Sequence, residues 1–174
     1  TLTVLDGPAG ASPKLAFGYN LDGDAGWETL TRLGDDQCPM YGGQKLDASG
    51  HWFSPEDTGH GFSAQILPNT EIYAAYVYDG DGFPRWLIGQ KDYDASVTSV
   101  TMQLLTGFCP TCPLVPLQSR SVGTLTRTLG ASSGNDGRPG ITSLDLGVAY
   151  EPRFWGAFFA DAPTFLLSER KGCD

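Results

Sequence analysis

The sequence has few positively charged residues and no long apolar run. It contains 11 lysines and arginines against 20 aspartates and glutamates, which gives a formal net charge of −9. Such a chain is repelled by phosphate backbones and anionic lipid headgroups, so we expect neither nucleic acid nor an anionic membrane surface as a partner. No stretch approaches the roughly 20 consecutive apolar residues of a membrane-spanning helix, so we expect no membrane insertion.

Recognisable catalytic motifs are also lacking. The sequence has no phosphate-binding glycine loop, and His51 and His60 are not spaced as zinc ligands. His60 has Glu56, Asp57 and Ser63 nearby, which are the ingredients of a hydrolase, so His60 is the candidate catalytic residue. Because two glycines flank His60, a loop residue is the simpler interpretation, and we expect a protein that is not an enzyme.

Turn-forming residues are abundant, with 23 glycines and 12 prolines. Between them lie short segments of alternating polar and apolar residues, and no long helical pattern is present. This arrangement predicts an all-β fold, an antiparallel sandwich or barrel of about eight to ten short strands stapled by disulfides. We expect residues 1–48 to form an N-terminal strand, linker and acidic turn that pack on or exchange with the core, and residues 49–174 to form the main β-module.

The four cysteines are Cys38, Cys109, Cys112 and Cys173. Cys109 and Cys112 form a C-x-x-C, but the proline after it disfavours the helix of a redox motif, so structural disulfides are the simpler interpretation. One pairing joins Cys109 to Cys112 and Cys38 to Cys173; in the alternative, Cys38 and Cys173 each bond to one member of the C-x-x-C. Cysteine pairs in a chain that does not begin with methionine predict a secreted protein, extracellular or at the cell surface.

The first residues alternate polar and apolar side chains and predict a strand that ends before a Gly/Pro-rich linker. Such a strand can pair within its own sheet or add to the edge of a neighbouring subunit. The candidate assembly residues are therefore Thr1, Leu2, Thr3, Val4 and Leu5.

Three polar residues further on, Asn20, Asp22 and Asp24, have the spacing of the first half of a calcium-binding loop. The glycine and the bidentate glutamate of such a loop are out of place, so a solvated turn is the simpler interpretation. Calcium is accordingly the one cofactor that the sequence suggests.

The stretch from Gly50 to Leu87 carries two glycine- and aromatic-rich patterns. The first, G-x-W-[YF]-x-P-x-x-[ST]-G-x-G-[FW], runs from Gly50 to Phe62, and the second, Y-x-Y-D-x-x-G-x-P-x-W-L, runs from Tyr76 to Leu87. With V-G-T-L-T at 122–126, these patterns resemble a β-module of secreted proteobacterial proteins over residues 49–171. The resemblance implies a secreted β-fold and no established activity. Residues 72–78 are so apolar that we expect them to be buried on both faces.

The aromatic residues exceed what one face of a small sheet needs to bury, so some should be exposed. The surface candidates are Trp52, Trp86, Trp155 and Tyr78. We predict a secreted, non-enzymatic structural or adhesive subunit that self-associates through its N-terminal strand, for example into an extracellular filament. Two alternatives are a carbohydrate- or surface-binding module that uses exposed aromatics and a secreted hydrolase centred on His60.

Overall fold

The computed structural model describes residues 2–5, 14–21, 23–31, 37–56, 59–106, 116–131, 138–150 and 155–167. All regular structure in these ranges is β-strand, and the strand pairs are antiparallel, which confirms the all-β prediction. No helix in the described part of the chain is long and apolar enough to cross a membrane. The chain forms two compact units, Thr1–Asp36 with Thr106–Gln118 and Gln37–Leu105 with Ser119–Asp174.

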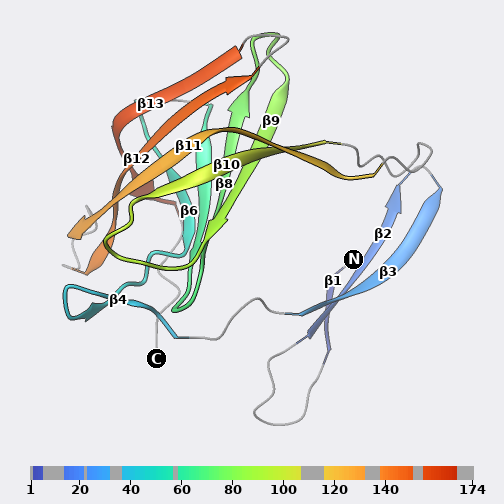
Figure 1. Ribbon diagram of the computed structural model, residues 1–174. Helices are drawn as coiled ribbons and strands as arrows, with labels where there is room; N and C mark the ends of the chain where they lie inside the picture. The colour runs from blue at the N-terminus through green and yellow to red at the C-terminus, as the bar shows by residue number, and fades with distance from the viewer. Residues whose placement is uncertain are drawn as a thin grey trace. The chain divides into compact units, whose positions relative to one another are not determined.

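The larger unit is built on a nine-stranded sheet in the order β13-β12-β11-β10-β9-β8-β7-β6-β14 (Figure 1). Each strand from β7 to β13 therefore lies beside its predecessor in the chain. The strands are β6 (Gly50–Phe53), β7 (Gly61–Ile66), β8 (Glu71–Tyr78), β9 (Pro84–Lys91), β10 (Ser99–Thr106), β11 (Gln118–Ala131), β12 (Pro139–Tyr150), β13 (Trp155–Pro163) and β14 (Phe165–Leu166).

The two ends of this sheet are brought together by one short segment. Pro163 at the end of β13 pairs with Ser143 of β12, and two residues later Phe165 of β14 pairs with Phe53 of β6. Between them, the Thr164 N–H donates to the carbonyl of Thr142 over 3.1 Å. The sheet is therefore nearly closed and barrel-like, which agrees with the barrel form of the prediction and leaves few unpaired edges.

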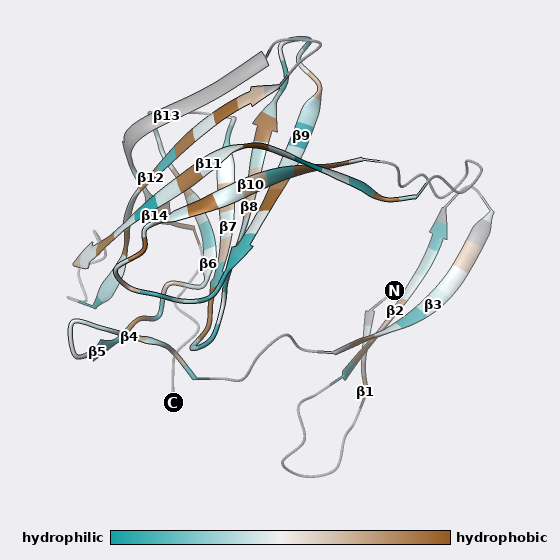
Figure 2. Cartoon of the chain, viewed as in Figure 1, coloured by the Kyte–Doolittle hydropathy of each residue, from teal (hydrophilic) through white to brown (hydrophobic). Residues whose placement is uncertain are grey.

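The interior of the closed sheet is filled by side chains from every second position of its strands. Along β8, buried and exposed residues alternate, and Figure 2 shows the same alternation of hydropathy along β11 and β12. The largest buried apolar side chains are Trp52, Tyr73, Leu46, Ile66, Leu87, Met102, Leu125, Ile141, Leu144 and Leu146. Burial of this kind stabilises a fold by about 1.5–3 kcal/mol for each large side chain.

Residues before the expected boundary at 48 belong to this core. The hairpin β4 (Met40–Tyr41) and β5 (Gln44–Lys45) precedes Leu46 and Ala48, both fully buried in the same cluster. The Tyr41 hydroxyl donates to the carbonyl of Leu129 over 2.9 Å, and the Trp52 indole N–H donates to that of Ala48 over 3.0 Å. The larger compact unit begins at Gln37, and residues 41–48 supply apolar side chains to the barrel.

A charged network lies in this interior, centred on the fully buried Glu71. Arg127 donates from Nε to Oε2 over 2.6 Å and from Nη2 to Oε1 over 2.7 Å. The Tyr73 hydroxyl donates to Oε2 over 2.6 Å, and Lys91 Nζ lies 2.7 Å from Oε1. The carboxylate therefore meets two cations and a hydroxyl, which is what a charge removed from water requires.

The network also shifts the acidity of its members. Burial alone would raise the pKa of the Glu71 carboxyl, but the hydrogen bonds from Arg127, Lys91 and Tyr73 hold that pKa below its usual value. Burial and the adjacent charge of Glu71 raise the pKa of the Tyr73 hydroxyl. Glu71 is thus ionised at neutral pH and ties β8 to β9 and β11.

The smaller unit contains a three-stranded sheet in the order β1-β2-β3, formed by β1 (Leu2–Leu5), β2 (Lys14–Leu21) and β3 (Asp24–Thr31). The strand expected at the start of the chain is present, and it pairs antiparallel with β2 of the same chain, Leu2 opposite Phe17 and Leu5 opposite Lys14.

Cys38 is the only cysteine among the described residues, and it is disulfide-bonded. Cys109, Cys112 and Cys173 lie outside the described residues. No disulfide therefore joins two described parts of the fold, and both pairings stay predictions.

Candidate functional site

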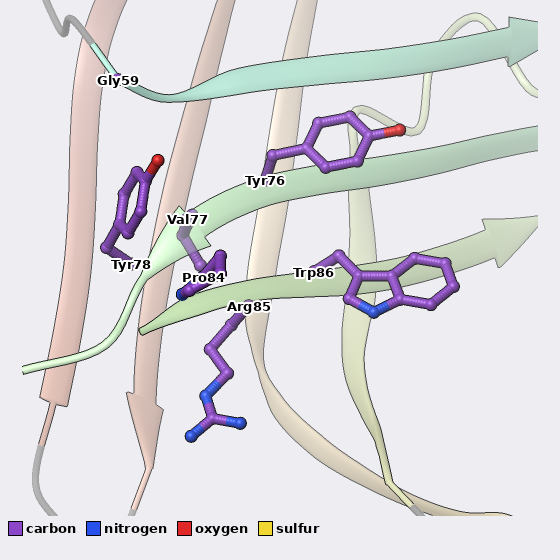
Figure 3. Close-up of a pocket in the computed structure, with 7 residues that line it drawn as sticks. All are labelled: Gly59, Tyr76, Val77, Tyr78, Pro84, Arg85 and Trp86. Carbon is purple, nitrogen blue, oxygen red and sulfur yellow. The ribbon is translucent and has the colours of Figure 1, made fainter. Parts of the chain in front are cut away.

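The outer face of the β8–β9 hairpin carries a hollow of about 410 Å³. Its lining is mostly aromatic and apolar, and we call it the aromatic hollow (Figure 3). The lining residues are Gly59, Tyr76, Val77, Tyr78, Pro84, Arg85 and Trp86. Concave sites of this size, apolar with a few polar groups, are where proteins hold small molecules or single units of a polymer.

Strand periodicity and register bring the three rings to one face. Tyr76 and Tyr78 are two residues apart on β8, so both point away from the side on which Tyr73 is buried. Antiparallel pairing places Trp86 opposite Tyr76 and Pro84 opposite Tyr78. The side chains stay open to solvent, with Tyr76 45%, Tyr78 49% and Trp86 60% exposed. Large aromatics left half exposed in one cluster are unusual on a soluble surface and mark a contact site.

The turn between the two strands is fixed by Asp79. Its Oδ1 accepts hydrogen bonds from the backbone N–H of Asp81 over 3.0 Å and of Phe83 over 2.9 Å. Gly82 has φ of 81°, a conformation that favours glycine, and its N–H donates to the Asp79 carbonyl over 2.9 Å. The hairpin therefore holds Tyr78 and the strand of Trp86 at a defined spacing.

Asp79 also forms an ion pair with Arg85, which is the one cation among the described residues that line the hollow. Arg85 Nε and Nη2 each lie 2.8 Å from Asp79 Oδ2. Partial desolvation would raise the pKa of the Asp79 carboxyl, but the hydrogen bonds from Phe83, Arg85 and Asp81 together hold it below its usual value. The pair is ionised at neutral pH, so the hollow presents aromatic faces beside a matched pair of charges.

Two of the four predicted surface aromatics lie in the hollow, namely Trp86 and Tyr78. The prediction for Trp52 is wrong: its side chain is 1% exposed, because β6 turns it into the barrel opposite Phe62. Trp155 belongs to β13, and its side chain lies outside the described residues.

The sequence patterns did not single out Tyr76 as an exposed residue, and they did not indicate that one face of β8 is exposed. Residues 72–78 are apolar enough to suggest burial on both faces, yet every second residue from Ile72 is only partly buried or exposed. The signal that could have revealed the site is the i, i+2 spacing of Tyr76 and Tyr78 directly before a turn.

His60 lies at the side of the hollow. Its ring meets that of Tyr78 edge-on, with the centroids 6.1 Å apart. Ser63 lies on β7, where it pairs with His51 and Ala74, and Asp57 is outside the described residues. His60 therefore packs against a member of the aromatic cluster, and its catalytic role stays an untested alternative.

The candidate calcium residues lie at the β2–β3 hairpin, where Asn20 pairs with Ala25 and Leu21 with Asp24. Asp22 is outside the described residues. Within the described ranges no group of three or more His, Cys, Asp or Glu side chains could hold a metal ion. Calcium binding at this hairpin stays a prediction.

No protein-family model matches the chain, and no curated protein or solved structure is significantly similar to it. The resemblance to a secreted proteobacterial β-module therefore stays a prediction that rests on its residue patterns alone. The function has to be argued from the site itself.

Proposed function

We propose that this chain is a secreted, non-enzymatic binding module that holds a carbohydrate polymer on the aromatic hollow, and so acts in adhesion to a glycan-bearing surface. One observation carries the proposal: three half-exposed aromatic rings, Tyr76, Tyr78 and Trp86, line one hollow on adjacent strands. Pyranose rings have apolar C–H faces that stack on aromatic side chains and hydroxyl groups that hydrogen-bond at the ring edge.

The polar groups of the hollow fit such a ligand. Each tyrosine brings a hydroxyl that can donate and accept, and the indole of Trp86 brings an N–H donor. Because the Arg85 cation is matched by Asp79, the hollow offers no excess positive charge. Together with a net charge of −9, this favours an uncharged polysaccharide over an acidic one.

The test is to screen the purified full chain on an array of neutral and acidic glycans and to titrate the best hits by calorimetry. Trp86→Ala should weaken binding at least about tenfold, since it removes the most exposed ring of the site. Trp27→Ala is the matched control, because Trp27 is 67% exposed on the separate sheet of the smaller unit. No glycan bound by the wild type, or equal losses in both variants, would contradict the proposal.

A further inference from the structure

The three-stranded sheet of the smaller unit leaves its large apolar side chains uncovered. Phe17, Trp27 and Leu30 are exposed, and Trp27 is 67% exposed. Among the residues of β1, β2 and β3 whose burial is described, only Gly18 is buried. A sheet of three short strands needs an apolar face packed against something to be stable. The described part of this sheet lacks such a cover.

Packing inside the sheet does not supply the missing burial. The Trp27 ring lies across Gly18 on the paired strand, and the Tyr19 ring lies across Gly26. These cross-strand contacts fill the space above the glycines and help to fix the register. They leave the Trp27 side chain largely exposed to solvent.

Within its described residues, the edge strand β1 also lacks the features that usually block an edge. Leu2 to Leu5 contain no charged residue and no proline, and their pairing with β2 runs without a bulge. Natural edge strands are usually blunted by charges, proline or bulges, because their unpaired N–H and C=O groups otherwise accept another strand. The opposite edge, β3, does carry such charges, at Asp24 and Glu28.

We propose that a second copy of this chain adds antiparallel to the open edge of β1 across a two-fold axis, which gives a continuous six-stranded sheet. If β1 pairs with β1 of the second copy, two uncharged edges lie side by side. If β3 paired with β3, acidic residues would lie close to one another. A two-fold contact uses the same surface on both copies, as most homodimers do.

The low net charge of β1, β2 and β3 also favours the pairing of a second copy at β1. The described residues of β1, β2 and β3 contain one base, Lys14, and two acids, Asp24 and Glu28. The whole chain has a net charge of −9, so two copies repel one another least where these strands meet. Salt screens the remaining repulsion, so association should strengthen as ionic strength rises.

The experiment compares Thr3→Lys with Thr29→Lys in the full chain by sedimentation velocity over a range of concentrations. Thr3 and Thr29 are both exposed and both pair with Ala16, so they lie in one row at opposite edges of the sheet. The wild type should reach twice the monomer mass. Thr3→Lys should weaken the dimer at least about tenfold, because it adds a positive charge to both of the paired edges, while Thr29→Lys should leave it unchanged.

Amide hydrogen exchange gives a readout that needs no variant. Protection of residues 2–5 should rise with protein concentration, while that of residues 24–31 should not. A wild type that stays monomeric at high concentration and high salt overturns the proposal. So does a dimer that Thr29→Lys disrupts as strongly as Thr3→Lys, or an open series of oligomers, since these show that β3 forms the contact.

Discussion

The two faces of the β8–β9 hairpin differ sharply although their residues alternate along the same strands. On the inner face, Tyr73 and Leu87 are fully buried in the barrel. On the outer face, Tyr76 and Trp86 are about half exposed and line the aromatic hollow. Since a one-residue step reverses the face, one short segment can contribute both to stability and to recognition. Substitutions on the inner face should therefore change stability, and substitutions on the outer face should change binding.

The largest expected effect comes from removing one tyrosine from the inner face. Tyr73→Ala should lower the free energy of unfolding by about 3–5 kcal/mol, because it leaves a large cavity. It also removes a hydrogen bond to the buried Glu71 carboxylate. Urea unfolding followed by tryptophan fluorescence measures the change.

Tyr76→Ala is the matched control on the outer face of the same strand. We expect a change of at most about 0.5 kcal/mol in stability, since surface substitutions usually cost little, together with a loss of glycan binding. Equal destabilisation by the two variants would show that the hollow is part of the core, and the two faces would then not have separate roles.

The next largest effect is the loss of stability expected when the buried carboxylate of Glu71 is removed. Glu71→Gln keeps the shape of the side chain but leaves Arg127 and Lys91 without their carboxylate, so we expect a loss of about 3 kcal/mol. A double variant, Glu71→Gln with Arg127→Met, should recover part of this loss because it removes one of the uncompensated cations. Failure of the double variant to recover any stability would mean that Arg127 matters through its other contacts, such as its hydrogen bond to the Asp94 carbonyl.

Much of the fold follows from the sequence, because alternation and turn residues mark the strands. The closure of the sheet does not, because β14 has only two residues and its pairing with β6 joins positions far apart in the chain. The same holds for Glu71 and Arg127, which lie 56 residues apart, so no local pattern connects them. Long-range pairing is decided by the whole barrel rather than by a segment.

The candidate site was predictable only in part, for a related reason. Aromatic residues on a strand are exposed or buried according to the face they occupy, and the face is set by neighbouring strands. Trp86 and Trp52 illustrate the point, since both lie on strands of one sheet and only Trp86 faces solvent. Composition could indicate that exposed aromatics exist, but the register was needed to assign them.

Acid should destabilise the inner face through protonation of Glu71. The pKa of Glu71 is lowered in the folded state, so the unfolded chain takes up its proton first as pH falls. The stability that Glu71 contributes is fully present above the pKa of the unfolded chain and is lost as pH falls through the lowered pKa of the folded state. Thermal unfolding between pH 7 and pH 3 should show this loss, and the Glu71→Gln variant should show a smaller one. A variant with the same pH dependence as the wild type would assign acid sensitivity to other carboxylates.

The smallest effect is expected when the outer face keeps its aromatic character. Trp86→Tyr retains a ring and a polar edge at the position opposite Tyr76, so glycan binding should fall by less than about threefold. Stability should change by no more than about 0.5 kcal/mol, because the side chain is 60% exposed. Calorimetric titration and urea unfolding of the same preparation measure both quantities. Trp86→Tyr could instead abolish binding as completely as Trp86→Ala. Binding would then require the size or the N–H group of the indole, and stacking on any aromatic ring would not be enough. The outer face would then have a shape requirement as strict as that of the packed interior.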